Sequence, residues 1–141
     1  MPESILVAHD GSTQAQQALS YALEIVPDGR IVLFHAIDPF AVTPDDEGLP
    51  RLTNQWRVRQ RDAAADLFEE ALAAVETGSV TIETATAFGS PAQTIVTAVD
   101  EYDVDGIVVG NRGLGDVSGA RLGSTAELVV RRATVPVTVV R

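Results

Sequence analysis

The chain has 141 residues, of which 45% are hydrophobic, so it can build one well-filled core and is too short for two ordinary domains. Twenty acidic residues against ten basic ones give a formal net charge of -10, which makes nucleic acid an unfavourable partner. Cysteine is absent, which excludes disulfides, zinc–thiolate sites and thiol catalysis.

We therefore expect one domain over residues 1–141. The N-terminal residues carry no basic stretch and no apolar run of signal-peptide length, and no run approaches the length of a membrane span. A soluble, cytoplasmic protein without a membrane partner is the expectation. All ten basic residues are Arg, which fits either a GC-rich genome or a high-salt cytoplasm in which salt screens the repulsion between carboxylates.

The first half of the chain alternates short apolar runs with amphipathic segments. A strand is predicted at residues 4–8, and a helix at 13–26 whose apolar side chains recur at helical spacing. The near-continuous apolar run 30–37 predicts a second strand that is covered on both faces. The Pro- and acid-rich segment 38–50 is predicted to be a mobile loop, and a long helix is expected at about 52–75.

The second half continues the same alternation. The run 80–88 alternates apolar and polar residues and predicts an edge strand. Ser90-Pro91-Ala92-Gln93 predicts a helix with an N-cap, a proline at the first helical position and a capping-box Gln. The run 105–109 predicts a fourth strand, a helix is expected from Ser124, and 135–140 is predicted to be a final edge strand.

This order of elements predicts a three-layer α/β/α sandwich, in which helices cover both faces of a five-stranded parallel sheet in a Rossmann-like arrangement. Ligands of open parallel sheets bind beyond the carboxyl ends of the strands, where the strand order reverses. If the order is 3-2-1-4-5, the reversal lies between the first and fourth strands. Asp10, which follows the first strand, and Gly110, which ends the fourth, would then face one crevice.

A glycine-lined turn leads from the fourth strand to the last helix. It reads Gly110-Asn111-Arg112-Gly113, followed after nine residues by Gly123-Ser124-Thr125. A helix N-terminus offers unpaired N–H groups and a partial positive charge to a phosphate, and Ser124-Thr125-Ala126-Glu127 has the pattern of a capping box. The spacing excludes the P-loop and the dinucleotide fingerprint. Taken alone, such a turn is also a common structural feature, and Ser124 a common N-cap.

Over essentially the whole chain, these residues resemble the universal stress protein family, whose ATP-binding members carry G-x2-G-x9-G-[ST] between the fourth strand and the fourth helix. Here the pattern is Gly110, Gly113, Gly123 and Ser124. The run Val7-Ala8-His9-Asp10-Gly11-Ser12 supports the resemblance. The family resemblance implies the adenine nucleotide alpha hydrolase-like version of the predicted fold.

The resemblance also implies a set of nucleotide contacts. Asp10 and the backbone of Gly110 would hold the ribose, and the backbone of Ala36 would border the adenine. The phosphates would be contacted by Gly113, Gly123, Ser124 and Thr125. On the residues alone, Asp10 could instead cap the helix that follows it, since aspartate is a preferred N-cap.

The charge of a triphosphate needs compensation in a chain without Lys. Arg112 and Arg121 flank the glycine turn and are the nearby cations, so Arg112 is counted with the nucleotide-binding residues. We expect Mg2+ to accompany the nucleotide and no dedicated metal ligand in the protein. His9 and His35 fall at strand ends but have no nucleophile or metal-ligand partner at useful spacing, so we interpret them as residues that pack or that support the site from behind. Trp56 is expected to cover the core or the mouth of the site.

The final strand, 135–140, would expose apolar residues at a sheet edge. The resemblance implies that it pairs with its counterpart in a homodimer; the alternative is an edge blunted by Pro136 and Arg141.

The leading hypothesis is an ATP-binding regulatory module of the stress response, with no catalytic residue and a protein partner not identified by the sequence. The alternatives are a slow ATPase or phosphotransferase using Asp10, and an interaction dimer that binds no nucleotide. ATP, AMP and a cyclic nucleotide are not distinguished.

Overall fold

The computed structural model describes residues 3–39, 53–111 and 122–141. Within these ranges, strands and helices alternate along the chain, as the sequence predicts. Their bounds are β1 Ser4–Ala8, α1 Thr13–Ile25, β2 Arg30–Ile37, α2 Asn54–Ala73, β3 Thr81–Phe88, α3 Pro91–Glu101, β4 Gly106–Gly110, α4 Ser124–Arg132 and β5 Val137–Val140. The predicted bounds of the first two strands are confirmed, and the long helix α2 is shorter than predicted.

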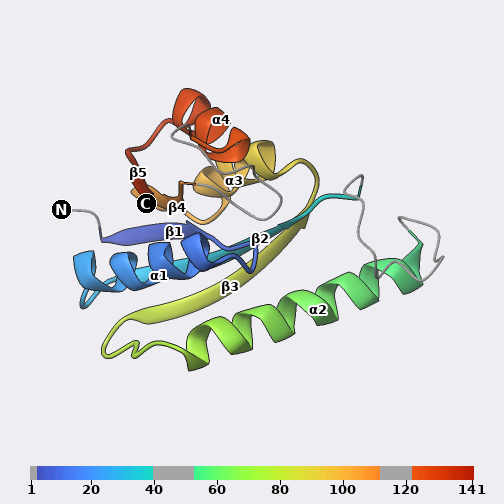
Figure 1. Cartoon of the computed structure of the whole chain (residues 1–141), viewed down its shortest axis with the longest axis horizontal. Helices are drawn as coiled ribbons and strands as arrows, with labels where there is room; N and C mark the ends of the chain where they lie inside the picture. The colour runs from blue at the N-terminus through green and yellow to red at the C-terminus, as the bar shows by residue number, and fades with distance from the viewer. Residues whose placement is uncertain (1–2, 40–52, 112–121) are drawn as a thin grey trace.

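The described strands form one parallel sheet in the order β3-β2-β1-β4-β5, which confirms the predicted order. Figure 1 shows α3 and α4 above the sheet and α2 below it. The buried residues of α1 belong to the same core cluster as those of α2, which gives the predicted three layers. Alternate residues of β1 explain why its sequence is apolar throughout. Val7 packs with Leu19 and Phe68 on the α1 and α2 face, whereas Leu6 packs with Ile95 on the opposite face.

The last strand is shorter than predicted because of its proline. β5 begins at Val137, after Pro136, which has no N–H to give to a neighbouring strand. The carbonyl of Pro136 still accepts a hydrogen bond of 2.9 Å from the N–H of Ile107. Pairing of β5 with β4 then continues to Gly110, which lies opposite Val140. β5 is therefore an edge strand of the described sheet, as expected.

Two predicted capping boxes are absent. Ser90 is the N-cap of α3, but its hydroxyl accepts no capping hydrogen bond, and Gln93 donates to Thr97 at 3.3 Å instead of reaching back. In α4 the N-cap is Gly123, so Ser124 is the first helical residue. Glu127 does not return to the cap because it pairs with Arg131, one turn further on, at 2.9 Å. The hydroxyl of Ser124 is consequently not committed to capping.

Trp56 covers the core at the carboxyl end of β3, where it packs against Phe88. Its side chain is 3% exposed, and the two ring centroids lie 5.8 Å apart. The guanidinium groups of Arg57 and Arg61 lie over the same Phe88 ring, at 5.3 and 5.1 Å. The predicted loop 38–50 lies, from residue 40 on, outside the described residues.

Candidate functional site

A cavity of about 230 Å³ lies at the carboxyl ends of β1 and β4, where the strand order reverses. Several predicted site residues line it together, and these are Asp10, Ala36, Gly110, Ser124 and Thr125. The remaining lining residues are Ala8, His9, Ser12, Ala15, Phe34, Pro91, Ile95, Val109 and Ala126. Arg112 and Gly113 lie outside the described residues, as does Arg121.

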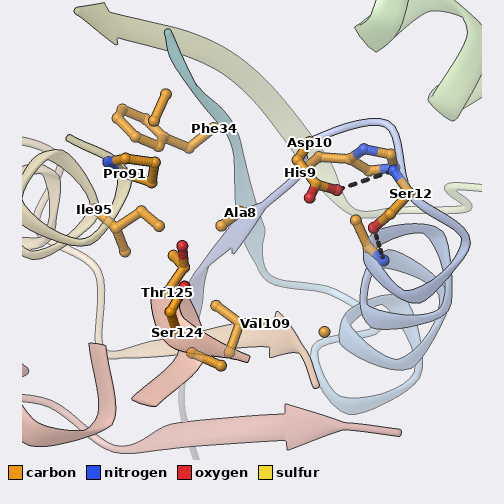
Figure 2. A pocket seen from close by; sticks show the side chains of 14 residues that line it. Ala8, His9, Asp10, Ser12, Phe34, Pro91, Ile95, Val109, Ser124 and Thr125 are labelled. Atoms are coloured by element: carbon orange, nitrogen blue, oxygen red, sulfur yellow. Dashed lines mark hydrogen bonds between the residues drawn. The ribbon is translucent and has the colours of Figure 1, made fainter. Parts of the chain in front are cut away.

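One wall of the cavity is the turn between β1 and α1. Asp10 is half-buried there, and its carboxylate accepts a hydrogen bond of 2.9 Å from the N–H of Ser12. Ser12 is the N-cap of α1, and its hydroxyl accepts from the N–H of Ala15 at 3.1 Å (Figure 2). Gly11 turns the chain with φ of 90°, a conformation that favours glycine. Asp10 thus supports the turn and leaves the capping role to Ser12.

His9 fixes the base of this turn. Its backbone N–H donates to the carbonyl of Phe34 at 2.8 Å, and its own carbonyl accepts from Nδ1 of His35 at 2.8 Å. Burial is the largest effect on His35 and lowers its pKa, while the hydrogen bond to His9 raises it in part. His35 also meets Phe68 edge to face, with centroids 6.5 Å apart. His9 is thus buried with one side on the cavity, and His35 is half-buried, and both are held by hydrogen bonds within the protein.

The opposite wall is the N-terminus of α4. In an α-helix the first N–H groups have no intrahelical acceptor, and here they belong to Ser124, Thr125 and Ala126, all of which line the cavity. The first hydrogen bond of this helix runs from the N–H of Glu127 to the carbonyl of Gly123 at 2.9 Å. Figure 2 shows the side chains of Ser124 and Thr125 on a different side of the cavity from Asp10. The site therefore combines N–H donors, hydroxyls and one carboxylate.

The backbone of Gly123 connects the two ends of the glycine loop. It is buried and is not among the lining residues; its N–H donates to the carbonyl of Asn111 at 2.8 Å. The N–H of Asn111 in turn donates to the carbonyl of Val140 at 2.7 Å. Gly123 thus joins the two ends of the glycine loop and anchors them to β5, and its N–H is already used within the protein.

Gly110 is glycine because helix α1 passes close to it. A Cβ atom at this position would lie 2.8 Å from both the carbonyl carbon and the Cβ of Gln14, and 3.0 Å from its carbonyl oxygen. Two of these three atoms belong to the backbone of α1, which is not free to move aside. The first glycine of the motif therefore has a packing reason that is independent of any ligand.

An apolar wall completes the cavity. Figure 2 shows Phe34, Pro91 and Ile95 together on the side away from Asp10. Sequence reasoning did not single out these residues, although Pro91 carries a signal, since it begins the helix that follows β3 and so must lie at the same end of the sheet. An apolar surface of this kind suits a flat ring system.

The charges around the cavity come from few groups. Asp10 is the acidic residue among the described lining residues, and none of them is Arg. The helices α1, α3 and α4 each contribute residues of their first turn to the lining, so three positive helix ends point to this region.

Among the residues of the described ranges, no group of three or more His, Asp or Glu could hold a metal ion. No described helix is long and apolar enough to cross a membrane.

A second hollow, of about 990 Å³, lies at the opposite end of the sheet. Its apolar lining includes Ile25 and Pro136. The charged residues that line it are Glu3, Glu24 and Asp105, all of them acidic. Asp105 is already engaged, since its carboxylate accepts from the backbone N–H groups of Glu3 and Ser4, which lowers the pKa of Asp105. The second hollow therefore suits an anionic ligand less well than the first.

Comparison with known proteins gives a consistent result. The family model of the universal stress protein family matches residues 1–141. A protein of Thermus aquaticus described as the universal stress protein in the QAH/OAS sulfhydrylase 3'region is 36% identical over 143 residues, covering 100% of both chains. The structure of the hypothetical protein MJ0577 superposes with a TM-score of 0.81 at 24% identity, covering 98% of this chain and 94% of that one. A universal stress protein in complex with cAMP has a TM-score of 0.67 at 25% identity, covering 99% and 97%.

Proposed function

This chain belongs to the universal stress protein family, and on that premise we propose that it is a cytoplasmic regulatory protein that binds an adenine nucleotide, with ATP as the expected ligand. The observation that carries the proposal is the first turn of α4, whose N–H donors line a cavity across from Asp10. In a chain with a net charge of -10, a site that presents donors and helix N-termini is suited to an anion. The cAMP complex of the solved relative supports an adenine ligand.

Each wall of the cavity fits one part of a nucleotide. The carboxylate of Asp10 would accept hydrogen bonds from ribose hydroxyls, and the apolar side chains of Phe34 and Pro91 would border the base. Ser124 and Thr125 would contact phosphate oxygens. The cavity of about 230 Å³ is smaller than typical small-molecule sites of about 300–1,000 Å³, so the phosphates would extend beyond the described walls.

Affinity would come from a small number of hydrogen bonds to charged oxygens. Each such bond contributes about 1.5–3 kcal/mol before ordering costs, so three or four of them are sufficient for micromolar binding. Arg112 and Arg121 would add positive charge. We propose that Mg2+ binds with the nucleotide through its phosphates, since the described residues offer no cluster of metal ligands.

The proposed output is binding to another protein, not turnover. The nucleotide would fix the glycine loop, which is anchored at Asn111 and Gly123 next to the last residue of β5. We also propose that β5 pairs with the same strand of a second copy, because Val137–Val140 is a half-buried apolar edge. Equilibrium ultracentrifugation tests this proposal, and a monomer at all concentrations would contradict it.

The nucleotide proposal is tested by calorimetric titration of ATP and Mg2+ into protein that has been stripped of bound nucleotide. We expect a micromolar Kd, and a loss of about tenfold for Ser124→Ala, because one donor to a phosphate is removed. Asp10→Asn keeps an acceptor for the N–H of Ser12 but loses the charge offered to the ribose, and we expect a similar loss. The matched control is Ser90→Ala, an exposed serine at the start of α3, which should bind as the wild type does.

Two results would overturn the proposal. One is the absence of heat from folded, nucleotide-free wild-type protein, which would favour the interaction dimer that binds no nucleotide. The other is wild-type affinity in both Ser124→Ala and Asp10→Asn, which would place any bound nucleotide elsewhere.

A further inference from the structure

We propose that Gln16 is a positioning residue for the nucleotide site, because it connects the Asp10 turn to the end of helix α2 through His9. The inference rests on the proposed nucleotide function. Gln16 lies on α1, is half-buried and is not among the residues that line the cavity. Its effect on a ligand would therefore pass through other residues.

A continuous series of hydrogen bonds supports this role. The backbone N–H of Gly11 donates to Nδ1 of His9 at 3.0 Å. Nε2 of His9 lies 2.9 Å from Oε1 of Gln16. The amide nitrogen of Gln16 donates to the carbonyl of Ala71 at 3.0 Å. Three links thus join a turn at residue 11 to a helix that ends 62 residues later, at Ala73.

Each link fixes the orientation of the next. An N–H group can donate only to a ring nitrogen without a proton, so Nδ1 of His9 is bare and Nε2 carries the hydrogen. That hydrogen points to Oε1 of Gln16, which leaves the amide N–H groups of Gln16 for Ala71. A flipped Gln16 amide would place two donors together and two acceptors together. One arrangement therefore satisfies the whole series.

The last link explains why α2 needs Gln16. Ala71 belongs to the last turn of α2, where carbonyl groups have no donor within the helix. The N–H of Val75 donates to Leu72, at 3.4 Å, so it does not serve Ala71. The side-chain amide of Gln16 donates the missing hydrogen bond, so a residue of α1 satisfies the carbonyl of Ala71 in the last turn of α2.

The first link determines how well the Asp10 turn is ordered. Gly11 is exposed and has φ of 90°. Because glycine has no Cβ atom, its backbone can adopt more conformations than that of any other residue. Without an oriented acceptor on His9, the turn would lose the hydrogen bond that holds Gly11, next to Asp10. The ligand would then have to order the turn on binding, and ordering about one residue weakens binding by about tenfold.

The test compares Gln16→Met with Gln17→Met. Both are glutamines of α1, but Gln17 is exposed and takes no part in the series. Affinities for Mg-ATP and for Mg-2′,3′-dideoxy-ATP are measured by calorimetry, together with thermal unfolding. We expect Gln16→Met to weaken ATP binding about tenfold and to leave dideoxy-ATP binding nearly unchanged, because that ligand has no ribose hydroxyl for Asp10 to hold. Gln17→Met should bind both ligands as the wild type does.

The outcomes separate this inference from the proposed function. Wild-type protein that binds no ATP overturns both. Wild-type binding together with an unaltered Gln16→Met overturns the positioning role alone, and equal weakening of both ligands would show a general structural defect and overturn it too.

A second measurement does not depend on a variant that folds. Long-range ¹H–¹⁵N spectra of the wild type identify the protonated nitrogen of each of the two histidines. We expect His9 to carry its proton on Nε2 and His35 on Nδ1, since Nδ1 of His35 donates to the carbonyl of His9. His35 is thus an internal reference for the other tautomer, in which Nδ1 carries the proton. A proton on Nδ1 of His9 would overturn the series at its first link.

Discussion

The close approach of α1 to β4 at Gly110 makes a quantitative prediction for Gly110→Ala. The added Cβ would lie 2.8 Å from two carbon atoms of Gln14, whereas carbon atoms in contact are about 3.5–4.0 Å apart. The helix and the strand would have to separate by about 1 Å, since a backbone carbonyl group cannot rotate away as a side chain can. Overpacking of this kind costs about 1–3 kcal/mol, and we expect a value near the upper end.

Gly106→Ala is the matched control on the same strand. Neither glycine has a positive φ, so neither substitution is strained in its backbone. The Cβ at Gly106 would meet the tip of Ile5, Cδ1, at 3.1 Å, and that flexible side chain can move. Both substitutions reduce the freedom of the unfolded chain equally, by about 0.4–1 kcal/mol, so the difference between the variants compares the contact with the backbone of Gln14 with the softer contact with Ile5.

Chemical and thermal unfolding of the two variants give the answer. We expect Gly110→Ala to be about 2–3 kcal/mol less stable than Gly106→Ala, which corresponds to a difference in Tm on the order of 10 °C for a domain of this size. Equal stability of the two variants would refute the reasoning, because it would show that α1 can yield at Gln14 without cost.

Two further predictions concern single side chains, and a third concerns the net charge. Ser12→Ala should lose about 1 kcal/mol of stability in urea unfolding because its hydroxyl caps the N–H of Ala15, whereas Ser90→Ala should lose little, and equal losses would contradict the assigned caps. Burial lowers the pKa of His35, so the unfolded chain binds a proton more readily than the folded protein; the stability of the wild type relative to His35→Gln should fall as the pH drops below about 6.5, and a pH-independent difference would count against this assignment. Because the net charge is -10, Tm should rise from dilute buffer to molar KCl, and a constant Tm would argue against adaptation to high salt.

The overall arrangement was predictable because the sequence leaves few alternatives. The apolar runs of β1 and β2 can be covered only from both faces, and strands that alternate with helices must run parallel. The strand reversal between β1 and β4 then fixes the position of the crevice, so Asp10 and Gly110 could be placed at one site although 100 residues separate them.

The details that failed depend on competition between neighbours. The capping box at Ser124 was wrong because Glu127 has a better partner in Arg131, and a local pattern does not show which partner is preferred. The hydrogen bond from the N–H of Gly123 to the carbonyl of Asn111 was not predicted, because the two residues lie twelve positions apart in the sequence. Phe34 was missed for a similar reason, since a buried residue in a central strand gives no sign that its ring also borders a cavity.

The hydrogen bond between Asn111 and Gly123 has a consequence for how such proteins diversify. The chain leaves β4 at Asn111 and enters α4 at Gly123, and this hydrogen bond joins the two points directly, so the length of the stretch between them can change without moving its ends. Doubling the length of a closed loop costs only about 0.6 kcal/mol, which a domain of this size can absorb. Natural variation, or a protein engineer, can therefore exchange this stretch to alter what is recognised while the remainder of the architecture is inherited unchanged.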